Sequence, residues 1–290
     1  RDSGEVCDGT DLGGQTCYKL GCRINALPVC SLTCNAISIN PCKAGHDEDS
    51  DTVDDNCDNC PSVSNTPQPN GDGDEIGDSC ERPNNQGFIS KIIYFEPFAS
   101  APSGWNSVGG GSWTQNADAM QGTVNTSMSN DPVFYLYYLS TANNSYIVEA
   151  NFYYRAAENT PGHRAGVVFA YNVSSSGNID RAYRCVFERN TNQLQLWRYT
   201  TYNNRGWQQS TYQDVSNPVN FSSARTIRAF VWKDASNNNH VICQYIDANH
   251  ASGVTTNEFT DSYSFSVAAQ AGLTLQNEMA TFTSFVYYAN

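Results

Sequence analysis

The chain has 290 residues, of which 39% are hydrophobic, and its formal net charge is −13. This length can hold one large domain together with small modules. The acidic balance and the lack of a basic aromatic patch argue against a nucleic-acid partner. The longest apolar run, Pro132–Leu139, is far too short for a transmembrane segment.

Residues 1–45 are predicted to form a cysteine-rich module without sustained periodicity. Nine of the 11 cysteines in the chain lie in the first 80 residues, namely Cys7, Cys17, Cys22, Cys30, Cys34, Cys42, Cys57, Cys60 and Cys80. A segment with so few aliphatic residues cannot build an adequate core, and disulfides worth about 2–4 kcal/mol each supply the missing stability. We therefore expect a secreted or extracellular protein. The odd total leaves one thiol free, or joined to another chain or to an upstream residue.

The start of the chain, RDSGEVCDG, contains no apolar core of a signal peptide. We expect a mature chain or a fragment trimmed from a longer precursor.

Residues 46–82 contain two tandem twelve-residue patterns of oxygen-bearing residues. Ca²⁺ takes six to eight oxygen ligands, and a tight loop supplies them from positions 1, 3, 5, 9 and 12, with a backbone carbonyl from position 7. The first loop offers Asp47, Asp49, Asp51, the carbonyl of Val53, Asp55 and Asp58. The second loop offers Asn70, Asp72, Asp74, the carbonyl of Ile76, Asp78 and Glu81. We predict Ca²⁺ as the cofactor, the alternative being a solvated acidic linker.

This acidic segment resembles thrombospondin type 3 repeats. The matching residues are Asp58-Asn59-Cys60-Pro61, Asn65 with Gln68, and Asn70 through Cys80. In that family Ca²⁺ organises an irregular chain, so the resemblance implies calcium binding and a disulfide between Cys60 and Cys80. The glycine of position 6 is replaced by Thr52 and Glu75, and a left-handed residue other than glycine costs roughly 1 kcal/mol.

The segment Gly4–Cys42 resembles cysteine-rich repeats of large secreted bacterial proteins, notably myxobacterial ones. The matching text runs from Gly4 to Cys17 and continues with Cys30, Cys34 and Cys42, whereas Cys22 is additional. The bridges stay open at this point, and a pair between Cys42 and Cys57 is conceivable. Cys57-x-x-Cys60 could supply two of the four ligands of a zinc site. No second cysteine pair stands at zinc-finger spacing, so disulfides are favoured over zinc.

Residues 83–87 are a predicted linker, and residues 88–290 are predicted to form strands. Apolar residues alternate with polar ones in several segments, which predicts antiparallel strands with one buried face. The segments are Tyr146–Tyr154, Ala165–Tyr171, Ile227–Val231, Leu273–Leu275 and a last one in which Ala280, Phe282, Ser284, Val286 and Tyr288 share a face. The predicted fold is mainly β, with an antiparallel jelly-roll sandwich following small disulfide-rich and calcium-loop modules. Cys185 and Cys243 lie in predicted strands, either as a disulfide or as two buried thiols.

The strand-rich region resembles the concanavalin A-like/laminin G superfamily through Arg164–Phe169, Ala271–Leu273 and Ala280–Phe285. The resemblance implies a jelly roll that often binds glycans and less often cleaves them.

Residues that could act on or bind a glycan are few. Glycoside hydrolysis needs two carboxylates roughly 5–9 Å apart, whereas Glu149 and Glu188 stand alone in their strands. No G-x-S-x-G motif is present, and we predict no enzymatic activity. The candidate ligand-binding residues are aromatic and basic, and they either stack on sugar rings or pack internally: Arg184, Trp197, Arg198, Tyr202 and Trp207.

The sequence thus predicts a secreted, non-enzymatic, calcium-binding protein of a bacterial surface or matrix, in which the lectin-like sandwich mediates adhesion or carbohydrate binding. The expected partner is a carbohydrate or a protein of the cell surface or matrix. An alternative is a structural subunit that self-assembles into an extracellular filament or tube through the sandwich and the N-terminal modules. A glycan-active enzyme is a third alternative.

Overall fold

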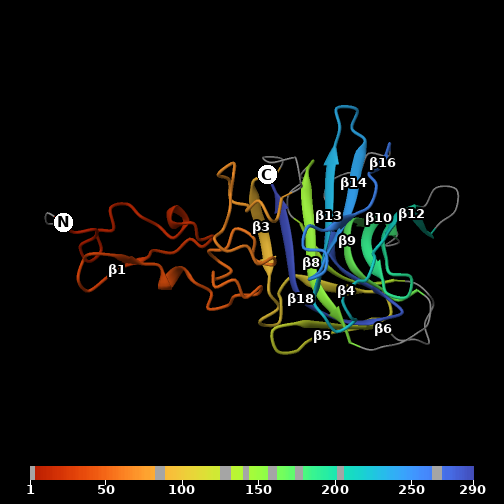
Figure 1. Cartoon of the computed structure of the whole chain (residues 1–290), viewed down its shortest axis with the longest axis horizontal. Helices are drawn as coiled ribbons and strands as arrows, with labels where there is room; N and C mark the ends of the chain where they lie inside the picture. Colours follow the sequence, from red (N-terminus) through yellow and green to blue (C-terminus); the bar gives the residue numbers. More distant parts are fainter. Residues whose placement is uncertain are drawn as a thin grey trace. The chain divides into compact units, whose positions relative to one another are not determined.

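A computed structural model describes residues 4–81, 89–124, 132–139, 144–155, 162–173, 179–200, 206–262 and 270–290 (Figure 1). The chain divides into two compact units, Arg1–Gly87 and Phe88–Asn290. The described residues contain β-strands and short 3₁₀ turns but no α-helix. No helix in this part of the chain is long and apolar enough to cross a membrane.

The first unit has little regular structure and is cross-linked by four disulfides. Its elements are the 3₁₀ turns η1 (Tyr18–Leu20) and η2 (Asn40–Cys42) and the short strands β1 (Val29–Cys30) and β2 (Ile37–Ser38). The disulfides are Cys7–Cys30, Cys17–Cys42, Cys22–Cys57 and Cys60–Cys80. The pair Cys42–Cys57 is therefore wrong. Cys22 instead bonds to Cys57, which joins the cysteine-rich segment covalently to the acidic loops.

The fifth disulfide lies in the second unit, where it joins Cys185 to Cys243. Cys34 is the remaining thiol. Five disulfides are typical of proteins from an oxidising, extracellular compartment.

The second unit consists of two antiparallel sheets. The seven-stranded sheet has the spatial order β12 (Gly206–Asp214), β11 (Gln193–Thr200), β10 (Ile179–Glu188), β9 (Arg164–Val173), β17 (Gln270–Gln276), β7 (Val133–Tyr138) and β4 (Trp105–Val108). The nine-stranded sheet has the order β15 (Val254–Thr255), β14 (Asn239–Ile246), β13 (Arg225–Lys233), β8 (Tyr146–Tyr154), β18 (Met279–Ala289), β6 (Met120–Val124) and β5 (Gly111–Gln115), with β16 (Phe259–Asp261) on β14 and β3 (Lys91–Glu96) on β18.

The core lies between these two sheets, because alternate residues of each strand point inward. Val148, Ala150 and Phe152 of β8 face Ala165, Val167 and Phe169 of β9 within one buried cluster. The disulfide between Cys185 of β10 and Cys243 of β14 ties the sheets together. The predicted antiparallel sandwich is confirmed.

The inward face of β18 differs from the predicted one. Its register against β8 shifts between Phe282 and Ser284, and the core cluster contains Phe285, Tyr287 and Ala289 in place of Ser284, Val286 and Tyr288. A bulge inserts one residue and moves every later side chain to the other face. The prediction that one alternation extends to Tyr288 is wrong for this reason.

Gly166 marks a tight approach between β9 and β10. A Cβ at this position would overlap the carbonyl oxygen of Cys185 and would lie 2.9 Å from the Cα of Val186. We predict that Gly166→Ala destabilises the sandwich by about 1–3 kcal/mol or more, because backbone atoms cannot rotate away as side chains do. Thermal unfolding followed by circular dichroism measures this, with the exposed Ser107→Ala on β4 as the control. Equal melting temperatures for both variants would contradict the prediction.

Candidate metal centre

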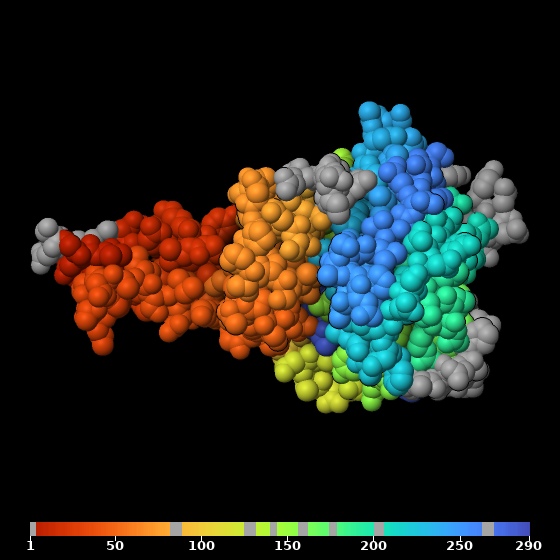
Figure 2. All heavy atoms as spheres, viewed as in Figure 1, coloured from red at the N-terminus to blue at the C-terminus, as the bar shows by residue number. Residues whose placement is uncertain are grey.

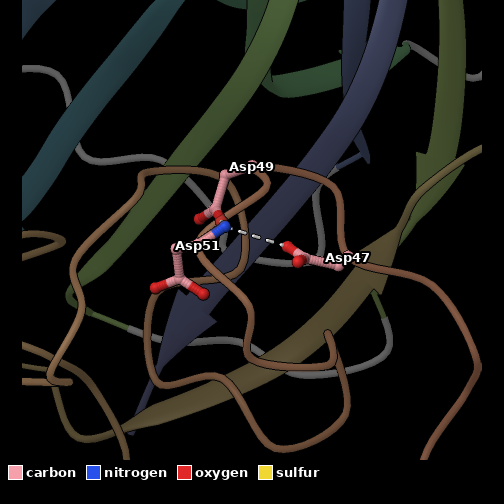
Figure 3. Close-up of side chains that lie close together, drawn as sticks. All are labelled: Asp47, Asp49 and Asp51. Carbon is pink, nitrogen blue, oxygen red and sulfur yellow. Dashed lines mark hydrogen bonds between the residues drawn. The ribbon is translucent and has the colours of Figure 1, made fainter.

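The first acidic loop folds so that three carboxylates converge. Oxygens of Asp47, Asp49 and Asp51 lie within 4.8 Å of one another (Figure 3). The loop is closed by its own backbone, since the N–H of Asp51 donates to Asp49 Oδ1 at 3.1 Å and the N–H of Val53 donates to Asp51 Oδ1 at 2.9 Å. Aspartate side chains that accept from the backbone two residues on produce this tight turning.

The second acidic loop repeats this arrangement. The N–H of Asp74 donates to Asp72 Oδ1 at 3.2 Å, and the N–H of Ile76 donates to Asp74 Oδ1 at 2.6 Å. Oxygens of Asp72, Asp74 and Glu81 lie within 4.8 Å of one another. The carboxylates at positions 3 and 5 therefore converge in both loops. The third converging carboxylate comes from position 1 in the first loop and from position 12 in the second.

Several carboxylate oxygens in these loops are buried and accept no hydrogen bond from the described residues. They are Asp49 Oδ2, Asp58 Oδ2 and Asp74 Oδ2. Asp58 is 1% exposed, and its other oxygen accepts from the N–H of Cys60 at 2.7 Å. An ionised carboxylate without a partner is costly to bury, and a proton, an ordered water or a cation removes that cost.

Some predicted ligands have other contacts in the structure. Asp55 accepts from the N–H of Glu48 at 2.8 Å and lies 2.6 Å from His46 Nδ1. Asn70 Oδ1 accepts from the N–H of Gly73 at 2.7 Å, and Asp78 Oδ1 accepts from the N–H of Gly71 at 2.7 Å. These three side chains stabilise the turns, and the carboxylates of Asp55 and Asp78 lie outside the converging groups. The carbonyl ligands Val53 and Ile76 stay predictions.

The glycine replacements at position 6 have different outcomes. Thr52 adopts a left-handed conformation with φ of 80°, so the first loop makes the expected bend with a β-branched residue. In the second loop the left-handed residue is Gly73, with φ of 77°, and Glu75 has no positive φ. The second loop thus avoids the backbone strain that the first loop carries.

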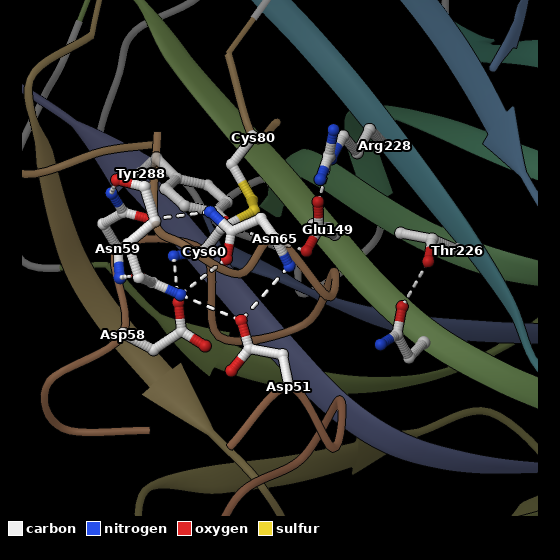
Figure 4. The surroundings of a disulfide bond; sticks show 12 residues. Asp51, Asp58, Asn59, Cys60, Asn65, Cys80, Glu149, Thr226, Arg228 and Tyr288 are labelled. Carbon is white, nitrogen blue, oxygen red and sulfur yellow. Dashed lines mark hydrogen bonds and ion pairs between the residues drawn. A yellow bond between two sulfur atoms is a disulfide. The ribbon is translucent and has the colours of Figure 1, made fainter. Parts of the chain in front are cut away.

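The segment between the loops holds the first loop in place. Gln68 Nε2 donates to Asp51 Oδ2 at 2.9 Å and to Asn65 Oδ1 at 2.7 Å, while Gln68 Oε1 accepts from the N–H of Asn59 at 2.8 Å. The amide of Asn65 donates to Asn59 Oδ1 at 2.7 Å, beside the Cys60–Cys80 disulfide (Figure 4). This amide network holds Asp51 in place for a ligand.

Burial and mutual repulsion perturb the carboxyl groups. Burial, followed by the charges of Asp58 and Asp51, raises the pKa of Asp49 to about 8. Burial also raises the pKa of Asp58 to about 6 and, in the second loop, shifts the pKa of Asp74 upward. A cation bound among these groups would favour their ionised form, release the protons to solvent and offset the repulsion between the carboxylates.

The donor set fits calcium. Every converging side chain offers oxygen, the ligand that hard cations prefer, and the groups lack the nitrogen and sulfur donors that favour zinc. Asp47, Asp49, Asp51 and Asp58 would hold one ion, and Asp72, Asp74 and Glu81 a second.

We predict that the calcium-free first unit loses stability as pH rises from 5 to 8. An unfolded aspartate has a pKa of about 3.9, whereas Asp49 and Asp58 in the folded chain titrate at about 8 and about 6. The folded state therefore binds more protons across this window, so its stability falls as pH increases. Melting temperatures in EDTA at pH 5 and pH 8 measure the effect. Asp49→Asn should reduce the dependence, and a melting temperature that increases with pH would contradict the prediction.

The candidate ligand-binding residues of the sandwich are only partly brought together. The guanidinium of Arg184 lies 4.6 Å from the ring centroid of Trp207 and 5.3 Å from that of Trp197. Arg164 also covers Trp197, at 4.6 Å, and Arg184 is only 1% exposed. Arginines lie over both tryptophan rings, which are half-buried, so these residues form a cation–π stack and not an open platform.

The other two candidates lie elsewhere or outside the described residues. Arg198 pairs with Asp261 at 3.1 Å and lies over Phe259 of β16, away from the tryptophans. Tyr202 lies outside the described residues.

The two strand carboxylates considered for catalysis both pair with arginines. Glu149 pairs with Arg228, and both side chains are buried. Glu188 lies 2.6 Å from Arg164. In these ion pairs the partner of each carboxylate is an arginine and not a second carboxylate.

A hollow at the edge of the sandwich was missed by sequence reasoning. We call it the edge groove; its volume is about 570 Å³, and it is lined by Gln209, Ser210, Thr211, Tyr212, Gln213, Asp214 and Asn257. The first six residues belong to β12, whereas Asn257 lies between β15 and β16 of the other sheet. The uncharged polar run Gln208–Gln213 is a signal for an exposed edge strand, but nothing in the sequence places Asn257 beside it.

No protein-family model matches the chain, and no curated protein matches it. Solved structures with a similar fold include a Bacillus subtilis protein of unknown function with a galectin-like fold, which is 14% identical with a TM-score of 0.47 over 69% of this chain and 96% of that one.

Two further structures are similar at comparable levels. A lectin from Bauhinia forficata in complex with GalNAc is 10% identical with a TM-score of 0.44, over 67% of this chain and 96% of the lectin. The marine PL-14 alginate lyase from Aplysia kurodai is 9% identical with a TM-score of 0.46, over 69% of this chain and 100% of the lyase. These likenesses are distant, and nothing about function follows from them.

Proposed function

We propose that the protein is an extracellular calcium-binding protein whose first unit folds around two Ca²⁺ ions. The observation that carries this proposal is the convergence of carboxylates in both loops, where Asp49 Oδ2 and Asp74 Oδ2 are buried and accept no hydrogen bond from the described residues. The resemblance of the segment to thrombospondin type 3 repeats supports the choice of calcium, and the disulfides support the location.

Isothermal titration of the metal-free full chain with CaCl₂ tests this proposal. We expect two ions per chain, with dissociation constants of about 10⁻⁴–10⁻³ M, the range of extracellular modules. Asp49→Asn should remove one site and Asp74→Asn the other. Asp118→Asn, in the sandwich and outside both loops, is the control and should leave both sites. Absence of binding heat at millimolar calcium would overturn the proposal.

We further propose that the sandwich provides a non-enzymatic binding function directed at carbohydrate. The edge groove supports this reading, because its lining is almost entirely polar and uncharged. The ion pairs that neutralise Glu149 and Glu188 support a role other than glycoside hydrolysis. An array of immobilised glycans tests the function, and a lack of binding to every glycan at high protein concentration would count against it.

A further inference from the structure

We propose that the edge groove binds a neutral carbohydrate, with the ring of Tyr212 stacking on a sugar and the surrounding side chains hydrogen-bonding its hydroxyls. This inference rests on the proposed carbohydrate-binding function and adds the site and the charge class of the ligand. In Figure 2 the teal atoms of this part of the chain lie at the surface of the sandwich unit.

The chemistry of the lining selects a polyhydroxylated ligand. Most small-molecule pockets are lined mainly by apolar side chains, whereas this groove offers amides, hydroxyls, one ring and one carboxylate. The side chains of Gln209, Ser210, Thr211, Tyr212 and Asn257 have no hydrogen-bond partner among the described residues, so their donors and acceptors are available to a ligand. A sugar hydroxyl both donates and accepts, which matches such a mixed set.

The ring that would stack is accessible. Tyr212 is 52% exposed, whereas arginines lie over the rings of Trp197 on β11 and of Trp207 on β12 itself. A tyrosine offers an apolar face and a polar tip to the same ligand.

The charge of the groove disfavours an acidic sugar. Asp214 is its one charged lining residue, and the chain as a whole has a net charge of −13. A uronate or sulfate would meet a carboxylate and no cation, which costs affinity. The same carboxylate accepts hydrogen bonds well from neutral hydroxyls.

Both walls of the groove are held in place. Gln193 Nε2 donates to Asp214 Oδ1 at 3.0 Å, which fixes the end of β12. On the other wall, the N–H of Thr256 donates to the carbonyl of Cys243 at 3.0 Å, and Glu258 pairs with His240 at 2.7 Å. Asn257 is therefore flanked by two anchored residues, and the groove requires little ordering when a ligand binds.

An exposed edge strand can also bind an extended peptide as an added β-strand. A bulge in β12 argues against this alternative. Leu196 pairs with Thr211 and Trp197 with Gln209, so Ser210 has no partner residue across β11. Bulges twist an edge and interrupt the ladder that an added strand would need. The interruption lies within the groove and favours a ligand bound by side chains.

Titration calorimetry of the calcium-loaded full chain with neutral oligosaccharides (glucan, mannan, galactan, xylan and chitin fragments) and with oligogalacturonate tests the inference. We expect one neutral class to bind and Tyr212→Ala and Asn257→Ala each to weaken binding about tenfold, as the loss of one stacking or buried hydrogen-bonding group does. Tyr138→Ala, at a tyrosine that is 56% exposed on β7, is the matched control and should bind as the native chain does.

The possible results distinguish a failure of the edge groove as the site from a failure of the proposed carbohydrate-binding function. A neutral sugar that binds the native chain and Tyr212→Ala equally would overturn the edge groove while leaving the carbohydrate function standing. Preferential binding of oligogalacturonate would overturn the neutral class. No binding of any oligosaccharide would overturn the function and the groove together. Protection of β12 amides from hydrogen exchange by an extended peptide would identify a strand-docking edge instead.

Discussion

Removal of calcium with EDTA is expected to lower the unfolding temperature of the first unit by about 20 °C or more and to leave the sandwich transition unchanged. Calcium at about 100 times its dissociation constant stabilises a folded unit by about 2.7 kcal/mol per site, hence about 5 kcal/mol for two sites. In a unit of this size each kcal/mol corresponds to about 4–8 °C.

The physical reason is the charge that folding gathers. Without a cation, folding brings the carboxylates of Asp47, Asp49 and Asp51 together and buries oxygens that accept no hydrogen bond from the described residues. Four disulfides limit how far the chain can expand but cannot neutralise these charges. Differential scanning calorimetry separates the two transitions. Asp49→Asn/Asp74→Asn should melt at one temperature with and without EDTA, and an unchanged native transition in EDTA would contradict the prediction.

Loss of the disulfide between the sheets is expected to be the largest effect in the sandwich. Cys185 and Cys243 are 58 residues apart in sequence, and both are fully buried. A loop of this length implies a stabilisation of about 4 kcal/mol through restriction of the unfolded chain. For a unit of about 200 residues that corresponds to about 10 °C.

Cys185→Ala/Cys243→Ala tests this effect in the same calorimetric experiment. The sandwich transition should fall while the calcium-dependent transition of the first unit stays in place. Cys34→Ser removes the free thiol without breaking a bond and is the control. A shift of less than 2 °C in the double variant would show that packing alone holds the sheets together.

The acidic loops show how far a spacing pattern can predict a site. Positions 1, 3 and 5 of the first loop, and 3, 5 and 12 of the second, converge as the pattern requires. Asp55, Asn70 and Asp78 have the right residue types, yet their side chains bond to His46 or to loop backbone. An aspartate or asparagine serves equally as a ligand and as a turn former, and the sequence does not distinguish these uses.

In the sandwich, too, the sequence predicts some inward-facing residues correctly and others wrongly. Alternation in β8 predicts its inward face correctly, because that strand is regular where it matters for the core. In β18 one inserted residue reverses the faces after Phe282, and no residue there signals a bulge as a glycine would. For Trp197 and Trp207 the sequence left sugar stacking and internal packing as alternatives. Arginines from β9 and β10 lie over both rings, a contact that depends on strand order.

The cysteine content of the sequence does not predict which cysteines pair. Their number predicts the compartment, whereas the partner of Cys22 depends on a chain path that spacing does not determine. Cys57 bonds to Cys22 and not to Cys42, and this bond makes the cysteine-rich segment part of the calcium unit.

We propose above that calcium is bound among the carboxylates of both acidic loops. The most direct measurement is an anomalous-difference map from crystals grown in millimolar calcium, with data collected at a wavelength where calcium scatters anomalously. We predict one peak among Asp47, Asp49 and Asp51 and a second among Asp72, Asp74 and Glu81. A map with ordered loops and no peak at either position would contradict the claim.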